Sequence, residues 1–192
     1  IVPVGRSGDG SMPSPTLHSN SILSHAWFGS TPAVPQLQVG VRLVPPSGPI
    51  IGLGTRVGTF INNVFQAGPG GTRTVAFEES NPTVDPLLLD RNDFFVSGAT
   101  LGGVLYVDEG STLLTTPAQI NGLMDVTATG NVSLNPQFSS IQFSFPHLSN
   151  ASPLRALGPP AAPSGGPPDD WDGDNRPNPA GSNMDIGADE VP

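Results

Sequence analysis

Short apolar runs separated by turn residues are the dominant pattern along this chain. Residues 50–53, 87–89 and 104–107 are such runs, and glycine, proline, asparagine or aspartate stands between them. Brief strands joined by loops are expected from this spacing. Residues 37–44 also alternate between apolar and polar positions, which predicts a strand with one exposed face. The pattern therefore predicts an all-β fold.

The remaining elements are less strongly marked. Strands are predicted within residues 72–77 and 98–106, with a turn at 108–110 and a polar loop over 78–86. Almost no stretch of a dozen residues combines helical periodicity with the absence of a breaker, and the best candidate for a helix is the short stretch 116–124. Helix is therefore expected to be a minor part of the structure.

An asparagine followed by apolar residues recurs along the chain, at Asn20, Asn62, Asn92 and Asn131. The intervals of roughly 30 to 40 residues suit the coils of a solenoid whose loops vary in length. Stacked parallel coils place equivalent side chains in rows, and an asparagine amide can donate to one neighbour and accept from the other. The sequence predicts an asparagine ladder in a parallel β-helix of few coils.

Composition and charge narrow the function. The 192 residues include 24 glycines and 23 prolines, only 36% are apolar, and there is no cysteine, so thiol chemistry and thiolate zinc sites are excluded. The seven basic residues, all arginine, face 16 acidic ones for a formal charge of −9, which argues against nucleic acid as a partner. The chain contains no run of 18 apolar residues, so no membrane span is predicted. This acidity suits a secreted, soluble or cation-binding protein.

The segment 170–190 concentrates acidic groups around one arginine. It begins Asp-Trp-Asp-Gly-Asp-Asn-Arg-Pro and ends Asp-Ile-Gly-Ala-Asp-Glu. An arginine fork can bind two carboxylates at once, so the segment is predicted to fold as a structural clasp. The clasp residues are Asp170, Asp172, Asp174, Arg176, Asp185 and Glu190.

Both halves of that segment, in this order, resemble the end of secreted right-handed parallel β-helix proteins of the choice-of-anchor type, which have a pectate-lyase-like solenoid. The similarity extends upstream through residues 130–138, 146–148 and 151–158, and covers the chain from about Asn92 onward. The resemblance implies an extracellular or cell-surface location. It also implies that the clasp is chiefly structural and closes the last coil.

The predicted organisation has three parts. Residues 1–15 form an extended N-terminal arm, 16–158 the β-helix coils with loop insertions, and 159–192 a Pro/Gly linker and the acidic clasp. The arm does not resemble a cap, so the first coil is expected to expose an unpaired edge. Its first residues, Ile1, Val2, Pro3 and Val4, are suited to adding a strand to a neighbouring sheet.

The leading functional hypothesis is a non-enzymatic extracellular structural protein. Copies of the chain would join as homo-oligomers, head to tail into a filament, through the open coil or the arm. The alternative is the C-terminal part of a carbohydrate-binding or polysaccharide-cleaving β-helix protein, with the missing N-terminal part of the same polypeptide as its partner. A passive stalk on a larger polypeptide is the third hypothesis.

Candidate chemistry is sparse. The alternating carboxylates of Asp170, Asp172 and Asp174 are a candidate Ca²⁺ site, although a salt-bridged clasp competes with it and the EF-hand pattern fails. The pairs Glu78–Glu79 and Asp108–Glu109 are expected in solvated turns, since adjacent strand residues point to opposite faces. The three histidines are too scattered to predict a metal cluster; they are His18, His25 and His147. We therefore expect no catalytic residue.

Overall fold

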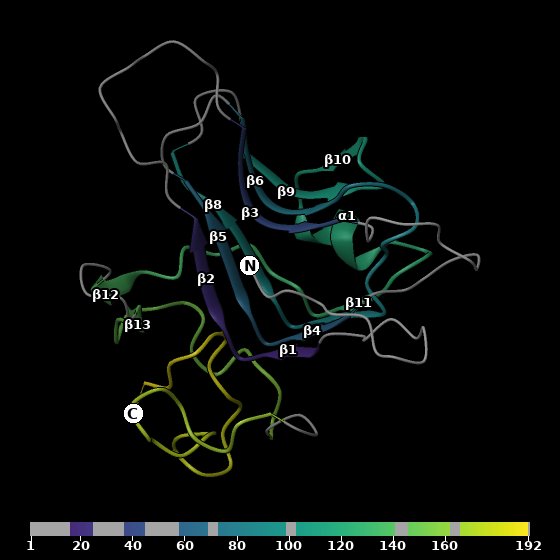
Figure 1. Ribbon diagram of the computed structural model, residues 1–192. Helices are drawn as coiled ribbons and strands as arrows, with labels where there is room; N and C mark the ends of the chain where they lie inside the picture. Colours follow the sequence, from purple (N-terminus) through teal and green to yellow (C-terminus); the bar gives the residue numbers. More distant parts are fainter. Residues whose placement is uncertain are drawn as a thin grey trace, which may run out of the picture.

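Three β-sheets, in which most neighbouring strands pair in parallel, make up most of the fold, seen in the computed structural model of Figure 1. The structure describes residues 16–24, 37–44, 58–68, 73–98, 103–140, 146–161 and 166–191. Within these ranges the regular structure is mostly strand, in agreement with the predicted all-β character. In the described part of the chain, no helix has the length and apolar character needed to cross a membrane.

The first and second sheets contain short strands that pair in parallel. The order in the first sheet is β1 (Thr16–His18), β4 (Thr59–Ile61), β7 (Leu88–Asp90) and β11 (Thr127–Thr129). The order in the second sheet is β2 (Ser21–Ser24), β5 (Val64–Ala67) and β8 (Asp93–Val96), and a single bridge adds Val132 beside Asp93.

The third sheet is longer and mixed. Its order is β3 (Leu37–Leu43), β6 (Arg73–Glu79), β9 (Gly103–Asp108) and β10 (Thr112–Leu114), and only β10 is antiparallel. β3 confirms the strand predicted at 37–44. The polar loop predicted over 78–86 is present only from residue 80, because Glu78 and Glu79 belong to β6. A separate antiparallel hairpin joins β12 (Phe138–Ser140) to β13 (His147–Leu148).

Successive stretches of chain add one strand to each of the three sheets. We call β1, β2 and β3 the first layer, β4, β5 and β6 the second, and β7, β8 and β9 the third. Because paired strands are parallel and in register, equivalent side chains of neighbouring layers lie next to one another. Phe77 of the second layer thus stacks on Tyr106 of the third, with ring centroids 5.2 Å apart.

The core lies between the sheets and is largely aromatic. Phe60, Phe65, Phe77, Phe94 and Tyr106 are all buried and contact one another edge-on, tilted or stacked. Aromatic pairs at such separations contribute about 0.5–1.5 kcal/mol each beyond the area that they bury. This packing explains how a chain with few apolar residues forms a core from three short sheets.

A short helix follows the third layer. α1 (Pro117–Asn121) confirms the helix predicted within 116–124, and it begins with a capping box. The Thr116 hydroxyl accepts the backbone N–H of Gln119, whose side-chain oxygen in turn accepts the N–H of Thr116. Proline as its first residue costs no hydrogen bond there. α1 packs against β11 and β10, beyond the third layer (Figure 1).

The C-terminal segment packs on the side of the sheets. The backbone N–H groups of Gly187 and Ala188 donate to Asn62 O at 3.1 Å and to Ser21 Oγ at 3.1 Å. A Cβ on Gly187 would approach Ser21 Oγ to 2.9 Å, so only glycine permits this contact without a shift. The clasp therefore lies against the corner between the first two sheets, at the first two layers, and not over the last coil as predicted (Figure 1).

Candidate functional site

A continuous row of asparagines crosses the layers where the first sheet bends into the second. Its members are Asn20, Asn63, Asn92 and Asn131. The Oδ1 atom of each later member accepts two hydrogen bonds from the member before it, from the backbone N–H and from Nδ2. The donor–acceptor distances are 2.9–3.1 Å. The row therefore has a direction, since every asparagine donates to the next layer.

The second hydrogen of each Nδ2 is also used. Nδ2 of Asn63, Asn92 and Asn131 donates to the carbonyl oxygens of Leu17, Phe60 and Leu89, each at 2.9–3.0 Å. These three side chains are at most 3% exposed. Buried amides are tolerated only when their donors and acceptors are satisfied, which the row achieves.

Asn62, which was predicted to belong to this row, lies beside it. Asn62 has a positive φ of 59°, and its counterparts in the other layers are Ser19, Arg91 and Gly130, all with positive φ. Asparagine tolerates this left-handed conformation better than most residues, so the doublet Asn62–Asn63 contains one bend residue and one row residue. Asn62 Nδ2 instead donates to Asp185 O at 2.9 Å, which ties the bend to the C-terminal segment.

One end of the row is closed by α1. Asn121 Oδ1 accepts the backbone N–H of Asn131 at 3.1 Å and its Nδ2 at 2.8 Å, and Asn121 Nδ2 donates back to Asn131 O at 2.9 Å. Asn121 thus takes the place that an asparagine of a further layer would occupy. Sequence reasoning missed it because Asn121 is followed by Gly122 and not by an apolar strand.

The other end of the row is open among the described residues. Asn20 donates onward to Asn63, but no described residue donates to Asn20 Oδ1. Within the same part of the chain β1, β2 and β3 each pair on one side only, with the second layer. Among the described residues, the first layer therefore has a side-chain acceptor without a donor, Asn20 Oδ1, beside three strand edges without a partner strand.

Truncating the middle of the row is expected to destabilise the protein strongly. Asn92→Ala leaves the buried N–H and Nδ2 of Asn63 without their acceptor, so we expect the free energy of unfolding to fall by about 2 kcal/mol. Urea denaturation checks this. The matched control is Asn135→Ala, because Asn135 is exposed and accepts one local N–H; an equal loss in both variants would show that the row adds no stability.

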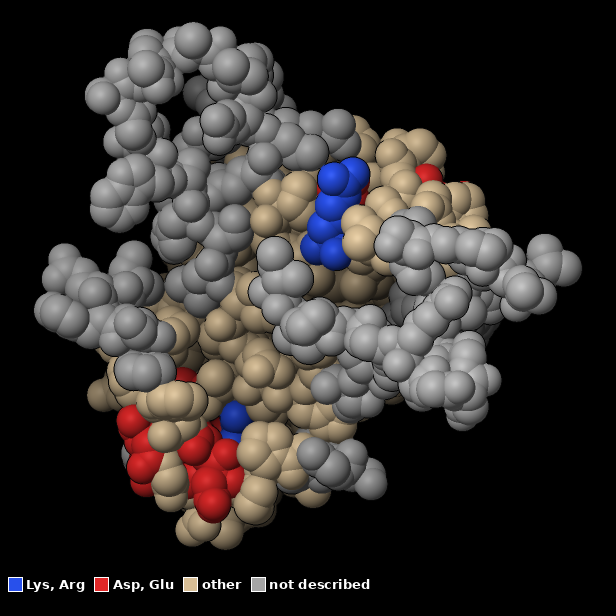
Figure 2. Space-filling model, in the orientation of Figure 1, with Lys and Arg blue, Asp and Glu red and all other residues tan. Residues whose placement is uncertain are grey.

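Arg176 forms the centre of the acidic C-terminal segment. Its Nε lies 3.2 Å from Glu190 Oε2, and the two side chains are 1% and 0% exposed. Its Nη2 donates to the carbonyl oxygens of Asp185 and Gly187 at 3.0 and 2.8 Å. Burial lowers the pKa of Arg176, while Glu190 and nearby aspartates counteract it by raising the pKa. Figure 2 shows acidic side chains gathered over this segment.

The carboxylates of Asp185 and Glu190 are held by backbone amides. Asp185 accepts the N–H groups of Ala156 at 2.7 Å and Val191 at 2.9 Å. Glu190 accepts those of Asn178 at 3.0 Å and Asp185 at 3.1 Å. Desolvation raises the pKa of both acids, and these amides partly offset it. Both groups are thus fully engaged in holding the segment together.

The candidate Ca²⁺ site does not assemble. Asp170 Oδ1 accepts the N–H groups of Asp172 and Asp174, and its Oδ2 accepts that of Glu190 at 3.0 Å. Asp170 therefore shapes a turn, while Asp172 and Asp174 are exposed. Among the described residues these three carboxylates do not form a metal-binding group. The predicted assembly arm, Ile1 to Val4, lies outside the described residues, as does His25.

Glu79 is buried, contrary to the solvated turn predicted for it. The Tyr106 hydroxyl donates to Glu79 Oε1, and the backbone N–H of Glu109 donates to Oε2 at 3.3 Å. Desolvation raises the pKa of Glu79 to about 7, with smaller contributions from nearby Asp108 and Asp85. Asp108 is half-buried, and its pKa is raised to about 6, first by desolvation and then by Asp125.

A pKa near neutrality suits a general acid, but Glu79 has no exposed surface. A catalytic acid must come within hydrogen-bond distance of the substrate, either directly or through one water. The Glu79 carboxyl already has protein partners on both oxygens. Its raised pKa is therefore a cost of burial in the core, not a sign of a reaction site.

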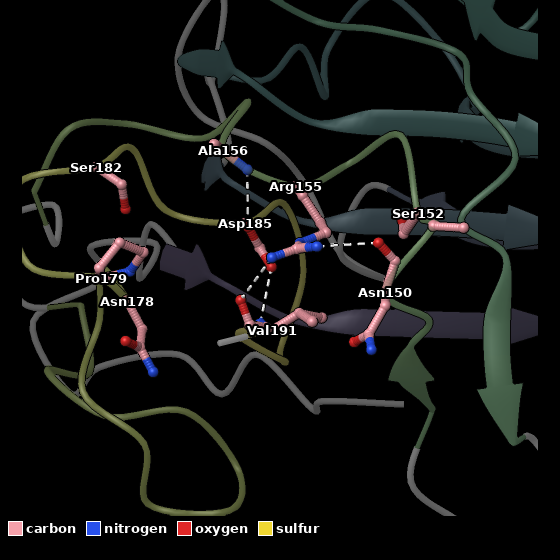
Figure 3. Close-up of a pocket in the computed structure, with 10 residues that line it drawn as sticks. Asn150, Ser152, Arg155, Ala156, Asn178, Pro179, Ser182, Asp185 and Val191 are labelled. Atoms are coloured by element: carbon pink, nitrogen blue, oxygen red, sulfur yellow. Dashed lines mark hydrogen bonds between the residues drawn. The ribbon is translucent and has the colours of Figure 1, made fainter.

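A pocket of about 340 Å³ lies beside the C-terminal segment (Figure 3). Arg155 is its cationic side chain, and the guanidinium donates to Asn150 O at 2.9 Å and to Val191 O at 3.4 Å. Asp185, the acid of this pocket, is occupied by the two backbone amides described above. The two ionic groups of this pocket are thus bound to backbone atoms, and its described lining residues include no pair of carboxylates that could carry out hydrolysis.

In comparisons with known proteins, no family model, no curated protein and no solved structure matches the chain. The likeness of the C-terminal motifs to the choice-of-anchor type therefore stays a prediction from the sequence.

Proposed function

We propose that this chain is a non-enzymatic structural module of an extracellular protein, built as a right-handed parallel β-helix and continued by another coil that stacks on its first layer. The observation that carries the proposal is the open acceptor at Asn20, next to the unpaired edges of β1, β2 and β3 among the described residues. Further support comes from the order of the strands, the direction of the hydrogen bonds along the asparagine row, and the hydrogen bonds that the buried ionisable groups form within the protein.

The order of the strands supports the β-helix. Three successive stretches of chain each contribute one strand to three sheets in the same order, and the strands pair in parallel and in register. A solenoid is the simplest path that repeats this order. Right-handedness follows the general preference of connections between parallel strands.

The ionisable groups support a structural role. Glu79, Asp185 and Glu190 have raised pKa values, yet each is buried and hydrogen-bonded within the protein. Arg176 is equally enclosed. A polysaccharide-cleaving enzyme needs an acid or base that reaches the substrate, and these four groups do not.

The direction of the asparagine row favours one kind of occupant for the first layer. Asn20 offers only its acceptor there, so the complement is an asparagine whose N–H and Nδ2 point toward it. Two first layers placed face to face would oppose acceptor to acceptor. A head-to-tail copy would have to supply these donors from Asn131, which are already bound by Asn121.

We therefore favour a preceding coil of the same polypeptide over the filament expected from the sequence. Residues 1–15 contain neither asparagine nor glutamine, so they carry no side-chain amide for this position. The coil that fits is one like the second layer, with an asparagine after a left-handed residue. In such an arrangement the chain described here is the closed end of a longer stack.

A fused coil tests this proposal. A second copy of residues 58–87 replaces residues 1–15, because residue 88 begins β7, the third-layer counterpart of β1. We expect the backbone amides of β1 and β2 to exchange with deuterium at least about tenfold more slowly in the fusion. The control fusion carries Asn63→Leu in the copy alone, which removes the Nδ2 donor to Asn20, leaves the backbone N–H, and should restore most of the exchange. Equal exchange rates in the parent and both fusions would contradict the proposal.

Sedimentation equilibrium of the unmodified chain separates the two assembly hypotheses. A monomer over a wide concentration range agrees with a coil from the same polypeptide. Concentration-dependent fibres, seen by electron microscopy, would show that a second copy occupies the first layer.

A further inference from the structure

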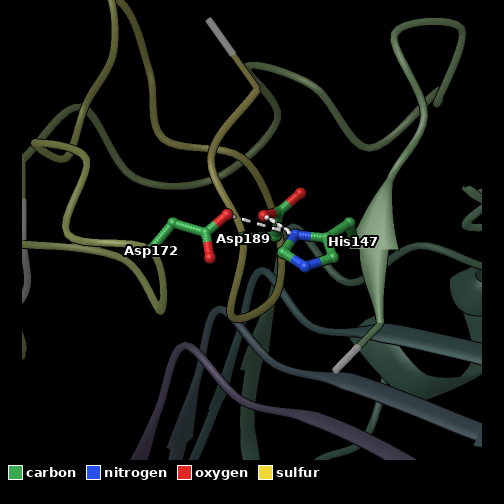
Figure 4. Close-up of side chains that lie close together, drawn as sticks. All are labelled: His147, Asp172 and Asp189. Atoms are coloured by element: carbon green, nitrogen blue, oxygen red, sulfur yellow. Dashed lines mark hydrogen bonds and ion pairs between the residues drawn. The ribbon is translucent and has the colours of Figure 1, made fainter. Parts of the chain in front are cut away.

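Three potential metal ligands from separate segments meet near β13. They are His147 in β13, Asp172 in the turn after Asp170, and Asp189 near the C-terminus (Figure 4). His147 Nδ1 lies 3.0 Å from Asp189 Oδ1 and 3.4 Å from Asp172 Oδ2. One ligand atom from each residue lies within 4.8 Å of the other two. The histidine thus faces both carboxylates with a single nitrogen.

The trio has more acceptors than donors. Nδ1 can carry one proton, and Asp189 Oδ1 is its hydrogen-bond partner. The nearest Asp172 oxygen lies at ion-pair distance from the same nitrogen, and no hydrogen bond is found for the Asp172 carboxylate within the described residues. Two negative charges therefore converge on a position that a proton only partly neutralises.

The positions of these atoms are partly fixed in advance. Asp189 is 8% exposed, and its other oxygen accepts the backbone N–H of Leu148 at 2.7 Å. This second hydrogen bond orients the carboxylate, as the outer partners of metal ligands commonly do. His147 and Asp172 are 36% and 52% exposed, so an ion can reach the trio from solvent.

The ligand types and their spacing select the metal. Zn²⁺ binds imidazole nitrogen and carboxylate oxygen at about 2.0–2.2 Å, and two ligands of a tetrahedral site are then about 3.3–3.5 Å apart. The two nitrogen–oxygen separations found here, 3.0 and 3.4 Å, are close to that value. Ca²⁺ prefers six to eight oxygens, and Mg²⁺ an octahedron of oxygens, so neither suits a histidine with two aspartates.

We propose that His147, Asp172 and Asp189 bind one Zn²⁺ ion, with solvent water as the fourth ligand. The ion joins β13 to the turn at Asp172 and to the C-terminal segment, which are far apart in sequence. The formal charge of −9, with no lysine in the chain, favours the approach of a cation. This site differs from the Ca²⁺ site predicted at Asp170, Asp172 and Asp174, because it shares only Asp172 with that set.

Titration of the purified chain with Zn²⁺ alone tests the proposal. Isothermal calorimetry is expected to show one ion per chain, and His147→Ala and Asp172→Asn are each expected to weaken the affinity by at least tenfold. Asp174→Asn is the matched control, because Asp174 is exposed in the same turn but outside the trio. Zn²⁺ should also raise the melting temperature of the parent and of Asp174→Asn, but not that of His147→Ala.

Two results would overturn the proposal. The first is the absence of stoichiometric Zn²⁺ binding to the parent at neutral pH. The second is binding that persists unchanged in both His147→Ala and Asp172→Asn, which would place the ion elsewhere on the chain. Asp172 is exposed and accepts no backbone N–H from the described residues, so its replacement should not impair folding.

Discussion

Replacing Glu79 with glutamine is expected to remove a loss of stability that the protein suffers as the pH rises from 4.5 to about 7. The pKa of Glu79 is raised from 4.5 to about 7 in the folded protein, first by desolvation. Between these values the folded state holds a proton that the unfolded state has released, so stability falls with increasing pH across this window. The stability from neutral Glu79 is fully present below pH 4.5 and lost above about pH 7.

The size of this effect follows from the shift. A difference of one pKa unit corresponds to about 1.4 kcal/mol, so the shift of Glu79 accounts for at most about 3 kcal/mol. Glutamine resembles the protonated acid, because its oxygen can accept the N–H of Glu109 while its amide group faces the Tyr106 oxygen. We therefore expect the variant to gain up to that amount relative to the parent between pH 4.5 and 8.

Denaturant unfolding of both proteins across this range measures the difference. The control is Glu109→Gln, which removes an exposed carboxylate of the adjacent turn and should leave the pH dependence nearly unchanged. Parallel stability curves for the parent and Glu79→Gln would mean that Glu79 is ionised in the folded state at little cost. Other buried acids, such as Asp93, also have a pKa raised by burial. Their contribution to the pH dependence is the same in the parent and the variant, so the difference between the two curves reports on Glu79 alone.

Replacing Arg176 with alanine is expected to lower the free energy of unfolding by about 3–5 kcal/mol, because it leaves the fully buried Glu190 carboxylate without its counter-ion. The carbonyl oxygens of Asp185 and Gly187 also lose their donor. We expect the C-terminal segment to detach from the corner at Asn62. Thermal unfolding and protease sensitivity of residues 166–191 check this outcome.

The matched control for Arg176→Ala is Arg91→Ala. Arg91 pairs with Asp90 at 3.0 Å, but its side chain is 40% exposed. Exposed ion pairs contribute about 0–1 kcal/mol, so this variant should unfold close to the parent. A similar, small effect of both substitutions would show that the enclosed pair does not hold the segment in place.

Local patterns in the sequence predicted local structure well. The alternation at 37–44 and the stretch at 116–124 correspond to β3 and α1. The recurrence of asparagine indicated a row, although the doublet at 62 and 63 did not show which residue takes the bend. That choice depends on the left-handed backbone at Asn62, which the spacing of the residues does not reveal.

The burial of individual acidic side chains and the contacts between segments far apart in sequence could not be predicted. Glu79 follows Glu78 in a strongly acidic pair, yet its neighbours in the folded protein are Tyr106 and the turn at Glu109. The approach of His147 to Asp172 and Asp189 depends on how three separate segments pack. The clasp was predicted at the last layer, because sequence order does not show that residues 185–188 contact Ser21 and Asn62.

The closure of the asparagine row by α1 has a consequence for how the length of the stack can change in evolution. Asn121 forms its hydrogen bonds in the row with Asn131, the last member, and α1 packs against β10 and β11 of the same end. Duplication or loss of whole layers farther back would leave it intact. Each such event would alter the length of the stack in steps of about 4.8 Å. The length of such a stack is therefore set by its number of layers, and it can change while the end closed by α1 stays the same.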